Sequence, residues 1–92
     1  MNDPFVLEQA NLWAKRMLAD KELTTPEQRI HSMYLTAFSR PARDEEVADA
    51  KQFLQGQAEE LGIAESKRAD DPKLWAEFAH VLINLKEFVF VR

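Results

Sequence analysis

The chain has no cysteine among its 92 residues. Disulfide bonds, thiolate zinc sites, cysteine nucleophiles and covalently attached haem are therefore excluded from it. The absence leaves the redox compartment open, because a chain without cysteine is stable in reducing and in oxidising surroundings. Glycine is also scarce, with two residues in all, and neither belongs to a glycine-rich phosphate-binding loop.

Long apolar runs and an excess of positive charge are missing too. No stretch approaches the roughly 20 apolar residues of a membrane span, and the start of the chain lacks the pattern of a signal peptide. We therefore expect no membrane insertion; either the domain is cytoplasmic or its export signal lies elsewhere in a longer chain. The 12 Lys and Arg are outnumbered by 16 Asp and Glu. Nucleic-acid binding depends on neutralising phosphates, so we expect no nucleic-acid partner.

What the chain does contain is typical of one helical domain. Apolar residues make up 46% and charged residues 30% of it, which is ordinary for a globular protein. The apolar residues recur at helical spacing, and no segment alternates as a half-buried strand does. We predict an all-α fold, and the short connections favour a four-helix up-down bundle. The predicted helices span 4–20, 26–39, 44–61 and 72–91, with a longer polar linker at 63–70.

Several residues mark the predicted helix ends. Asp3, Thr25 and Asp71 each precede a proline, which pairs a good N-cap with a residue suited to the first helical position. No such pair precedes the third helix, where Asp44 is expected to help instead. Gly62 is placed to end that helix, since glycine accepts the left-handed conformation that helix ends often need.

The fourth predicted helix is apolar over most of its circumference. A helix of this kind is buried on several sides, and a four-helix domain has limited cover to offer. Phe5 and Leu12, which lie off the main apolar face of the first helix, suggest exposed apolar surface as well. We therefore predict contact with another domain, another protein or a second copy through Phe5, Leu12, Val81 and Phe88.

The polar residues of the fourth helix form one narrow stripe that is a possible polar site. Its members include Glu77, His80, Asn84 and Glu87. The Glu77-x-x-His80 spacing occurs in di-iron bundles, but those sites need two such motifs and two further carboxylates. Here the motif is single and is expected to face solvent. We predict neither a metal site nor a cofactor.

No constellation of catalytic residues is evident, and we expect that the chain alone is not an enzyme. No serine lies in a glycine-framed elbow, and Glu45 and Glu46 are neighbours on a solvated helix. A DNA-reading helix-turn-helix is excluded on charge. Its recognition helix would begin with Asp44, Glu45 and Glu46, which would face phosphates with the wrong sign.

Several segments occur together in the order found in one family. They are Asn2-Asp3-Pro4-Phe5-Val6, Arg29, Tyr34, Phe38-Ser39-Arg40-Pro41, Glu45-Glu46, Trp75 and Leu82-Ile83-Asn84-Leu85-Lys86-Glu87-Phe88-Val89-Phe90-Val91. This ordered set resembles the C-terminal end of the planctomycete-specific domain of unknown function, over essentially the whole chain. The chain departs from the family at Ala42-Arg43, which replaces a common Pro-Thr, and at Lys86, where a small polar residue is frequent.

The resemblance implies the kind of protein in which the domain occurs, but no activity. Such domains close large exported proteins that often also carry a planctomycete-type cytochrome-c-like domain. Residues 1–92 would then be a single helical domain, the C-terminal fragment of a larger multidomain protein in the periplasm or cell envelope. Any haem would belong to another domain. Arg40 is expected to interact with the carbonyls that end the second helix.

Three hypotheses for the function follow. The first is a non-catalytic helical module that packs against its parent protein or a partner, with self-association possible. The alternative is that the domain contributes part of an active site shared with upstream domains of an exported enzyme. The third is a stand-alone adaptor resembling a death-fold bundle, which would carry a discrete pair of charged patches.

Overall fold

All regular secondary structure in the part of the chain that the structure describes is helical. The computed structural model describes residues 3–91, and describes side chains as far as residue 86. Its helices are α1 (Pro4–Ala19), α2 (Pro26–Phe38), α3 (Asp44–Leu61), the 3-10 helix η1 (Glu65–Asp70) and α4 (Pro72–Val91). The prediction of an all-helical fold is confirmed, and the predicted helix ends agree to within one residue. The linker predicted at 63–70 is wrong in part, because η1 occupies most of it.

The helix starts follow from local hydrogen bonding. The carboxylates of Asp3 and Asp71 each accept a hydrogen bond from a backbone N–H in the first helical turn. Thr25 accepts from the backbone N–H of Gln28 at 3.1 Å, and the Gln28 side chain accepts from the Thr25 N–H at 3.2 Å. This reciprocal pair is a capping box, and it satisfies two backbone donors that the helix cannot satisfy by itself.

The start of α3 differs from the expectation, whereas its end agrees with it. Arg43 is the N-cap, and its backbone N–H donates to the carboxylate of Glu46 at 2.8 Å. Glu46, and not Asp44, therefore supplies the capping side chain. Gly62 ends α3 in the left-handed region, with φ of 69°. Ser39 ends α2 in the same region, with φ of 61°.

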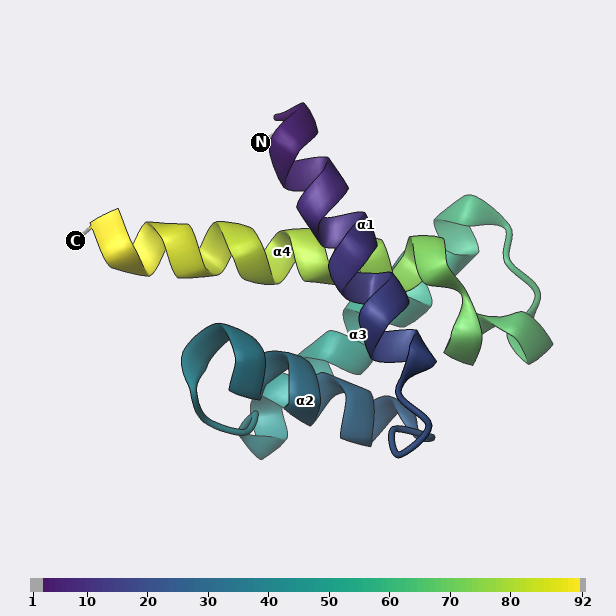
Figure 1. Ribbon diagram of the computed structural model, residues 1–92. Helices are drawn as coiled ribbons and strands as arrows, with labels where there is room; N and C mark the ends of the chain where they lie inside the picture. The colour runs from purple at the N-terminus through teal and green to yellow at the C-terminus, as the bar shows by residue number, and fades with distance from the viewer. Residues whose placement is uncertain (1–2, 92) are drawn as a thin grey trace.

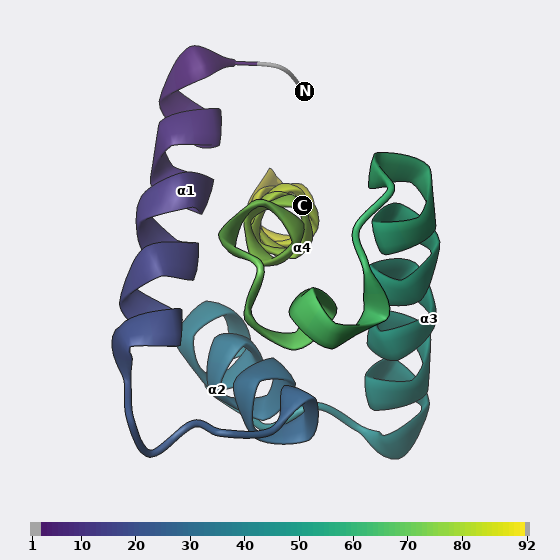
Figure 2. The ribbon, with the colours of Figure 1, turned by 90° about the vertical axis from the view of Figure 1, so that its right-hand side faces the viewer.

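The last helix lies at the centre of the domain. In Figure 2, α4 is seen end-on, with α1 and α3 seen lengthwise on either side and α2 below. It contacts all three, and the pair α1–α4 is the most extensive. Helices of an up-down bundle run alongside one another, so the predicted bundle arrangement is not confirmed. The physical reason is that α4 is apolar around much of its circumference and is buried best when the other helices cover it from several sides.

Small side chains form much of the contact between α1 and α4. Ala10 and Ala14 are buried on α1, and Ala76 and Ala79 are buried on α4. Small side chains allow two helix backbones to approach closely. The largest fully buried side chains come from α2 and α4 and fill the space between the helices: Ile30, Met33, Leu74, Trp75 and Leu82.

Candidate interaction surface

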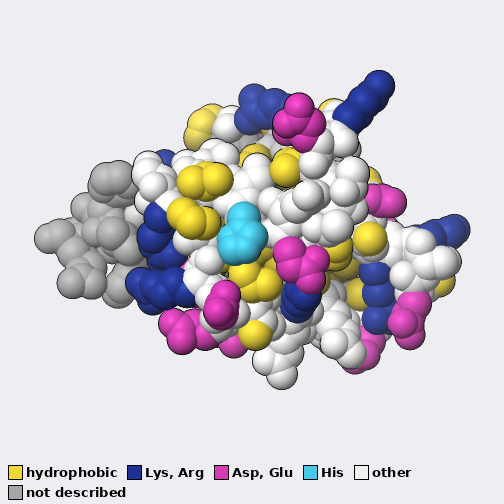
Figure 3. Space-filling model, turned by 90° about the horizontal axis from the view of Figure 1, so that it is seen from below, with side chains coloured by type: hydrophobic (Ala, Val, Ile, Leu, Met, Phe, Trp, Pro, Cys, Tyr) yellow, Lys and Arg dark blue, Asp and Glu magenta, His cyan; other side chains and the backbone are white. Residues whose placement is uncertain are grey.

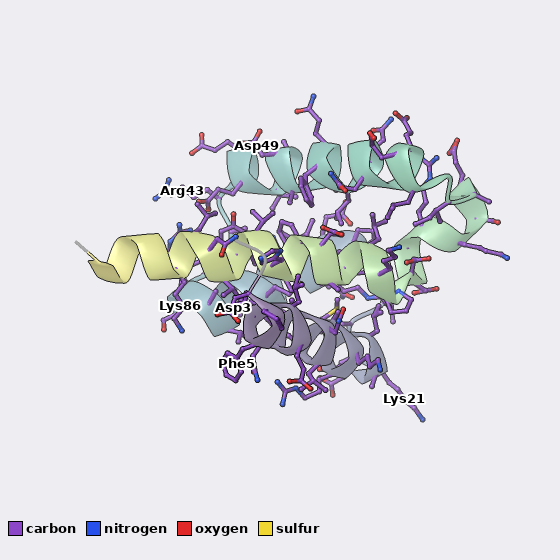
Figure 4. The ribbon with its side chains drawn as sticks, turned by 90° about the horizontal axis from the view of Figure 1, so that it is seen from above. Asp3, Phe5, Lys21, Arg43, Asp49 and Lys86 are labelled. Carbon is purple, nitrogen blue, oxygen red and sulfur yellow. The ribbon has the colours of Figure 1, made fainter. Side chains whose placement is uncertain are left out.

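Exposed apolar side chains gather on the side of α1 that faces away from the core. Phe5 is 65% exposed and Leu12 is 44% exposed. Helical spacing places Arg16 on the same side and the half-buried Gln9 and Trp13 along its border, where Trp13 packs against the core. We call these five residues the α1 outer face. In Figure 4 the Phe5 side chain points away from the body of the domain. Both apolar residues were predicted as partner contacts, and the structure places them on one surface.

A groove of about 320 Å³ lies beside the α1 outer face and continues it. We call it the α1 groove. Three helices line it, namely α1, α2 and α4, through Gln9, Trp13, Arg16, Thr36, Ala37, Ile83 and Lys86. Because Gln9, Trp13 and Arg16 belong to both features, the groove and the exposed apolar residues form one continuous surface.

The other two predicted contact residues are not part of this surface as far as the structure describes it. Val81 is half-buried and lies one helical turn after Phe78, whose ring packs against Phe53 of α3 at a centroid distance of 6.2 Å. Val81 therefore lies on the side of α4 that faces α3. Phe88 lies beyond the residues whose side chains are described. The backbone of α4 does extend past the other helices at its C-terminal end (Figure 1).

The polar stripe of α4 is not fully exposed, contrary to the expectation. Glu77, His80 and Asn84 are each half-buried, and the Nε2 atom of His80 is buried without a hydrogen-bond partner. Glu77 and His80 line a cavity of about 120 Å³ against α1. Ligand pockets usually span roughly 300 Å³ or more, so this cavity is small for a substrate. Glu87 lies outside the residues whose side chains are described.

Glu27 and His31, which lie four residues apart on α2, could share a metal ion by spacing, but each has another partner. Glu27 forms an ion pair with Lys51, which lowers the pKa of the Glu27 carboxyl group. His31 accepts a hydrogen bond through Nδ1 from the backbone N–H of Ala42 at 3.1 Å. Glu27 and His31 therefore serve separate structural contacts. Within the described residues, no three His, Cys, Asp or Glu side chains lie close enough together to hold a metal ion.

Arg29 is a buried cation that ties three parts of the chain together. Only 6% of the residue is exposed. Its guanidinium donates to the Leu23 carbonyl at 3.2 Å, to the Ala69 carbonyl at 2.6 Å and to the Asp70 carboxylate at 2.8 Å. The indole N–H of Trp75 donates to the same Ala69 carbonyl at 2.8 Å. Arg29 thus fixes the α1–α2 loop and η1 against the core.

Arg40 and Glu46 form a second clamp, between the end of α2 and the start of α3. The guanidinium donates to both carboxylate oxygens at 2.8 and 3.0 Å, and it lies over the rings of Tyr34 and Phe38. The Arg40 bond holds the pKa of Glu46 at about 2. Arg40 also donates to the Pro41 carbonyl. The expectation that Arg40 binds the carbonyls ending α2 is therefore wrong.

A larger groove of about 550 Å³ lies where α2, α3, η1 and α4 meet. Its apolar part includes Leu54, Leu74 and Trp75, and charged residues of both signs surround it. The sequence interpretation missed this groove because it depends on η1. It also missed the buried role of Arg29, although a signal was present: Arg29 shares the apolar side of its helix with Met33.

The side of the domain seen in Figure 3 has no field of one charge sign. Acidic and basic side chains alternate there with small hydrophobic patches. The described residues also include no helix with the length and hydrophobicity that crossing a membrane requires.

Together these features define the class of protein: an all-helical domain with exposed apolar side chains and two arginine clamps, one buried at Arg29 and one partly exposed at Arg40. The chain belongs to the PSD1 family, described as "Protein of unknown function (DUF1553)", whose family model matches residues 1–54. The matched part comprises α1, α2 and the first part of α3. No curated protein and no solved structure matches the chain.

Proposed function

We propose that the domain is a non-catalytic helical module that packs against the rest of a larger parent protein or against a partner protein. The observation that carries this proposal is the continuous surface of the α1 outer face and the α1 groove. Scattered exposed apolar residues are normal, but exposed apolar residues that adjoin a groove with apolar walls are typical of an interaction site. Phe5 and Leu12 are the exposed anchors of this surface.

The proposal includes the setting that the resemblance implies. The parent would be a planctomycete protein, exported to the periplasm or cell envelope, with this domain at its C-terminal end. Membership of the PSD1 family supports the family resemblance from which this setting is inferred. The course of α4, which extends beyond the other helices (Figure 1), supports a neighbour on that side.

The test is an NMR titration of the ¹⁵N-labelled domain with the upstream portion of its parent. We expect chemical-shift changes concentrated on the α1 outer face and the α1 groove, and their loss in the double variant F5D/L12D. The matched control is L35D, because Leu35 is 52% exposed but lies on α2, outside this surface. The proposal would be contradicted if no chemical shift changed at stoichiometric excess, or if L35D abolished the changes as fully as F5D/L12D. If sedimentation of the domain alone shows a dimer, the partner is a second copy of the chain.

A second candidate function is a contribution to an active site shared with upstream domains of an exported enzyme. The observation that favours it is the buried, unpartnered Nε2 atom of His80, next to Glu77. In the parent enzyme, H80Q and E77Q would then lower kcat while leaving the unfolding midpoint of the domain nearly unchanged. An unchanged kcat in both variants would exclude this function.

A further inference from the structure

The charged residues that line the α1 groove are all cations. They are Arg16 from α1 and Lys86 from α4, and no carboxylate lines the groove. This contrasts with the chain as a whole, whose net charge is −4. The acidic residue nearest to Arg16 in the sequence is Asp20, the C-cap of α1, and it does not line the groove. The charged side chains that line the groove are therefore of one sign, on a domain that is acidic as a whole.

The rest of the groove lining is apolar or small. Trp13 is half-buried and stands at one wall, Ile83 is half-buried at another, and Ala37 is buried at the α2 side. At about 320 Å³ the groove has room for one or two large apolar side chains. An apolar centre with a charged rim is the usual arrangement of a protein interface.

The two other hollows in the described surface do not specify a partner in the same way. The larger groove has rim charges of both signs. The cavity beside His80 is much smaller, at about 120 Å³. Of these three hollows, the α1 groove is the one that combines apolar walls, lining charges of one sign and adjoining exposed anchors.

From this combination we propose that the α1 groove binds an acidic amphipathic segment of the partner, and the inference rests on the packing function proposed above. A bulky apolar side chain of that segment sits between Trp13 and Ile83. Its carboxylates face Arg16, and Lys86 adds positive charge to the same rim. Complementary charge of this kind selects partners and speeds association, and like charges in its place are strongly disfavoured.

The experiment uses the 92-residue chain and three synthetic peptides in ¹⁵N NMR titrations at low and at moderate salt. The first peptide is acetyl-Glu-Glu-Leu-Phe-Glu-Glu-Leu-Leu-Glu-Glu-amide. The second has lysine in place of every glutamate, and the third has serine in place of every leucine and phenylalanine. We expect the first to bind at least about tenfold more tightly than either other peptide, with shifts at Trp13, Ala37 and Ile83.

Charge reversal supplies the matched comparison. R16E is expected to weaken binding of the acidic peptide by roughly fivefold or more and to strengthen binding of the basic one. K67E makes the same change in net charge on exposed η1 and should alter binding little. The unfolding midpoint of each variant verifies that it is folded. Because Arg16 is exposed, neither variant is expected to disturb the core.

The outcomes separate this inference from the proposed function. Equal binding of the acidic and basic peptides, equal effects of R16E and K67E, or shifts outside the α1 groove would each overturn the acidic specificity. If no peptide binds but the upstream portion of the parent still shifts the α1 outer face, the acidic inference fails and the packing function stands. If the parent portion causes no shifts either, both fail.

Discussion

Replacing Arg29 by methionine should destabilise the domain by about 2–3 kcal/mol. Methionine fills similar volume but removes every donor. The hydrogen bonds to the Leu23 and Ala69 carbonyls contribute roughly 1 kcal/mol each, and a part-buried carbonyl left without a donor costs about 1 kcal/mol more. Only the Leu23 carbonyl loses its donor entirely, because Trp75 still donates to Ala69. Removing the buried cation also removes its desolvation penalty, which offsets part of this loss of stability.

The ion pair with Asp70 should contribute little to this figure. The Asp70 side chain is 79% exposed, and the Arg29 side chain is 7% exposed. Solvent screens such a carboxylate, so D70N should cost less than about 1 kcal/mol. R29K should fail to restore stability, because an ammonium group lacks the planar fork that reaches three acceptors at once.

The assay is urea unfolding followed by circular dichroism at 222 nm, with the m-value checked for constancy. The expected order of stability is wild type, then D70N, with R29K and R29M lowest. A free energy of unfolding of R29M within about 0.5 kcal/mol of the wild-type value would refute the role given to the carbonyl bonds. A D70N loss as large as that of R29M would show instead that the ion pair, and not the carbonyl bonds, holds η1 in place.

Three further perturbations test other parts of the structure. The bond to Arg40 lowers the pKa of Glu46 to about 2, so the stability that Glu46 contributes is present above about pH 5 and is lost as the pH falls towards 2. The free energies of unfolding of wild type and E46Q, measured in urea, should differ by on the order of 1 kcal/mol at pH 7 and converge near pH 2. G56A should stabilise the domain by about 0.5–1 kcal/mol, because a Cβ at this exposed helical position meets no atom, whereas G62A should destabilise it by about 1 kcal/mol at φ of 69°; equal effects in thermal unfolding would contradict this contrast. A14L should cost about 1–3 kcal/mol or more, since the fully buried Ala14 has no room for a larger side chain, and a neutral result would show that α1 and α4 are loosely packed.

The sequence by itself determined the helices and most of their ends. Helix formation depends on local spacing and on capping groups within a few residues, so Asp3, Thr25 and Gly62 act as predicted. The exposed apolar character of Phe5 and Leu12 was also predictable, because both lie off the main apolar face of α1. Membership of the PSD1 family, found over residues 1–54, agrees with the resemblance in its general form.

The tertiary structure alone decided how the helices cross and which side chains meet. Periodicity gives each helix an apolar side but no angle to its neighbours, so it could not show that α4 crosses α1 and α3. The contact of Arg29 with Ala69 and Asp70 joins residues about 40 positions apart, and no local pattern fixes such a distance. The same holds for the α1 groove, whose cations come from α1 and α4 and are brought together only by packing.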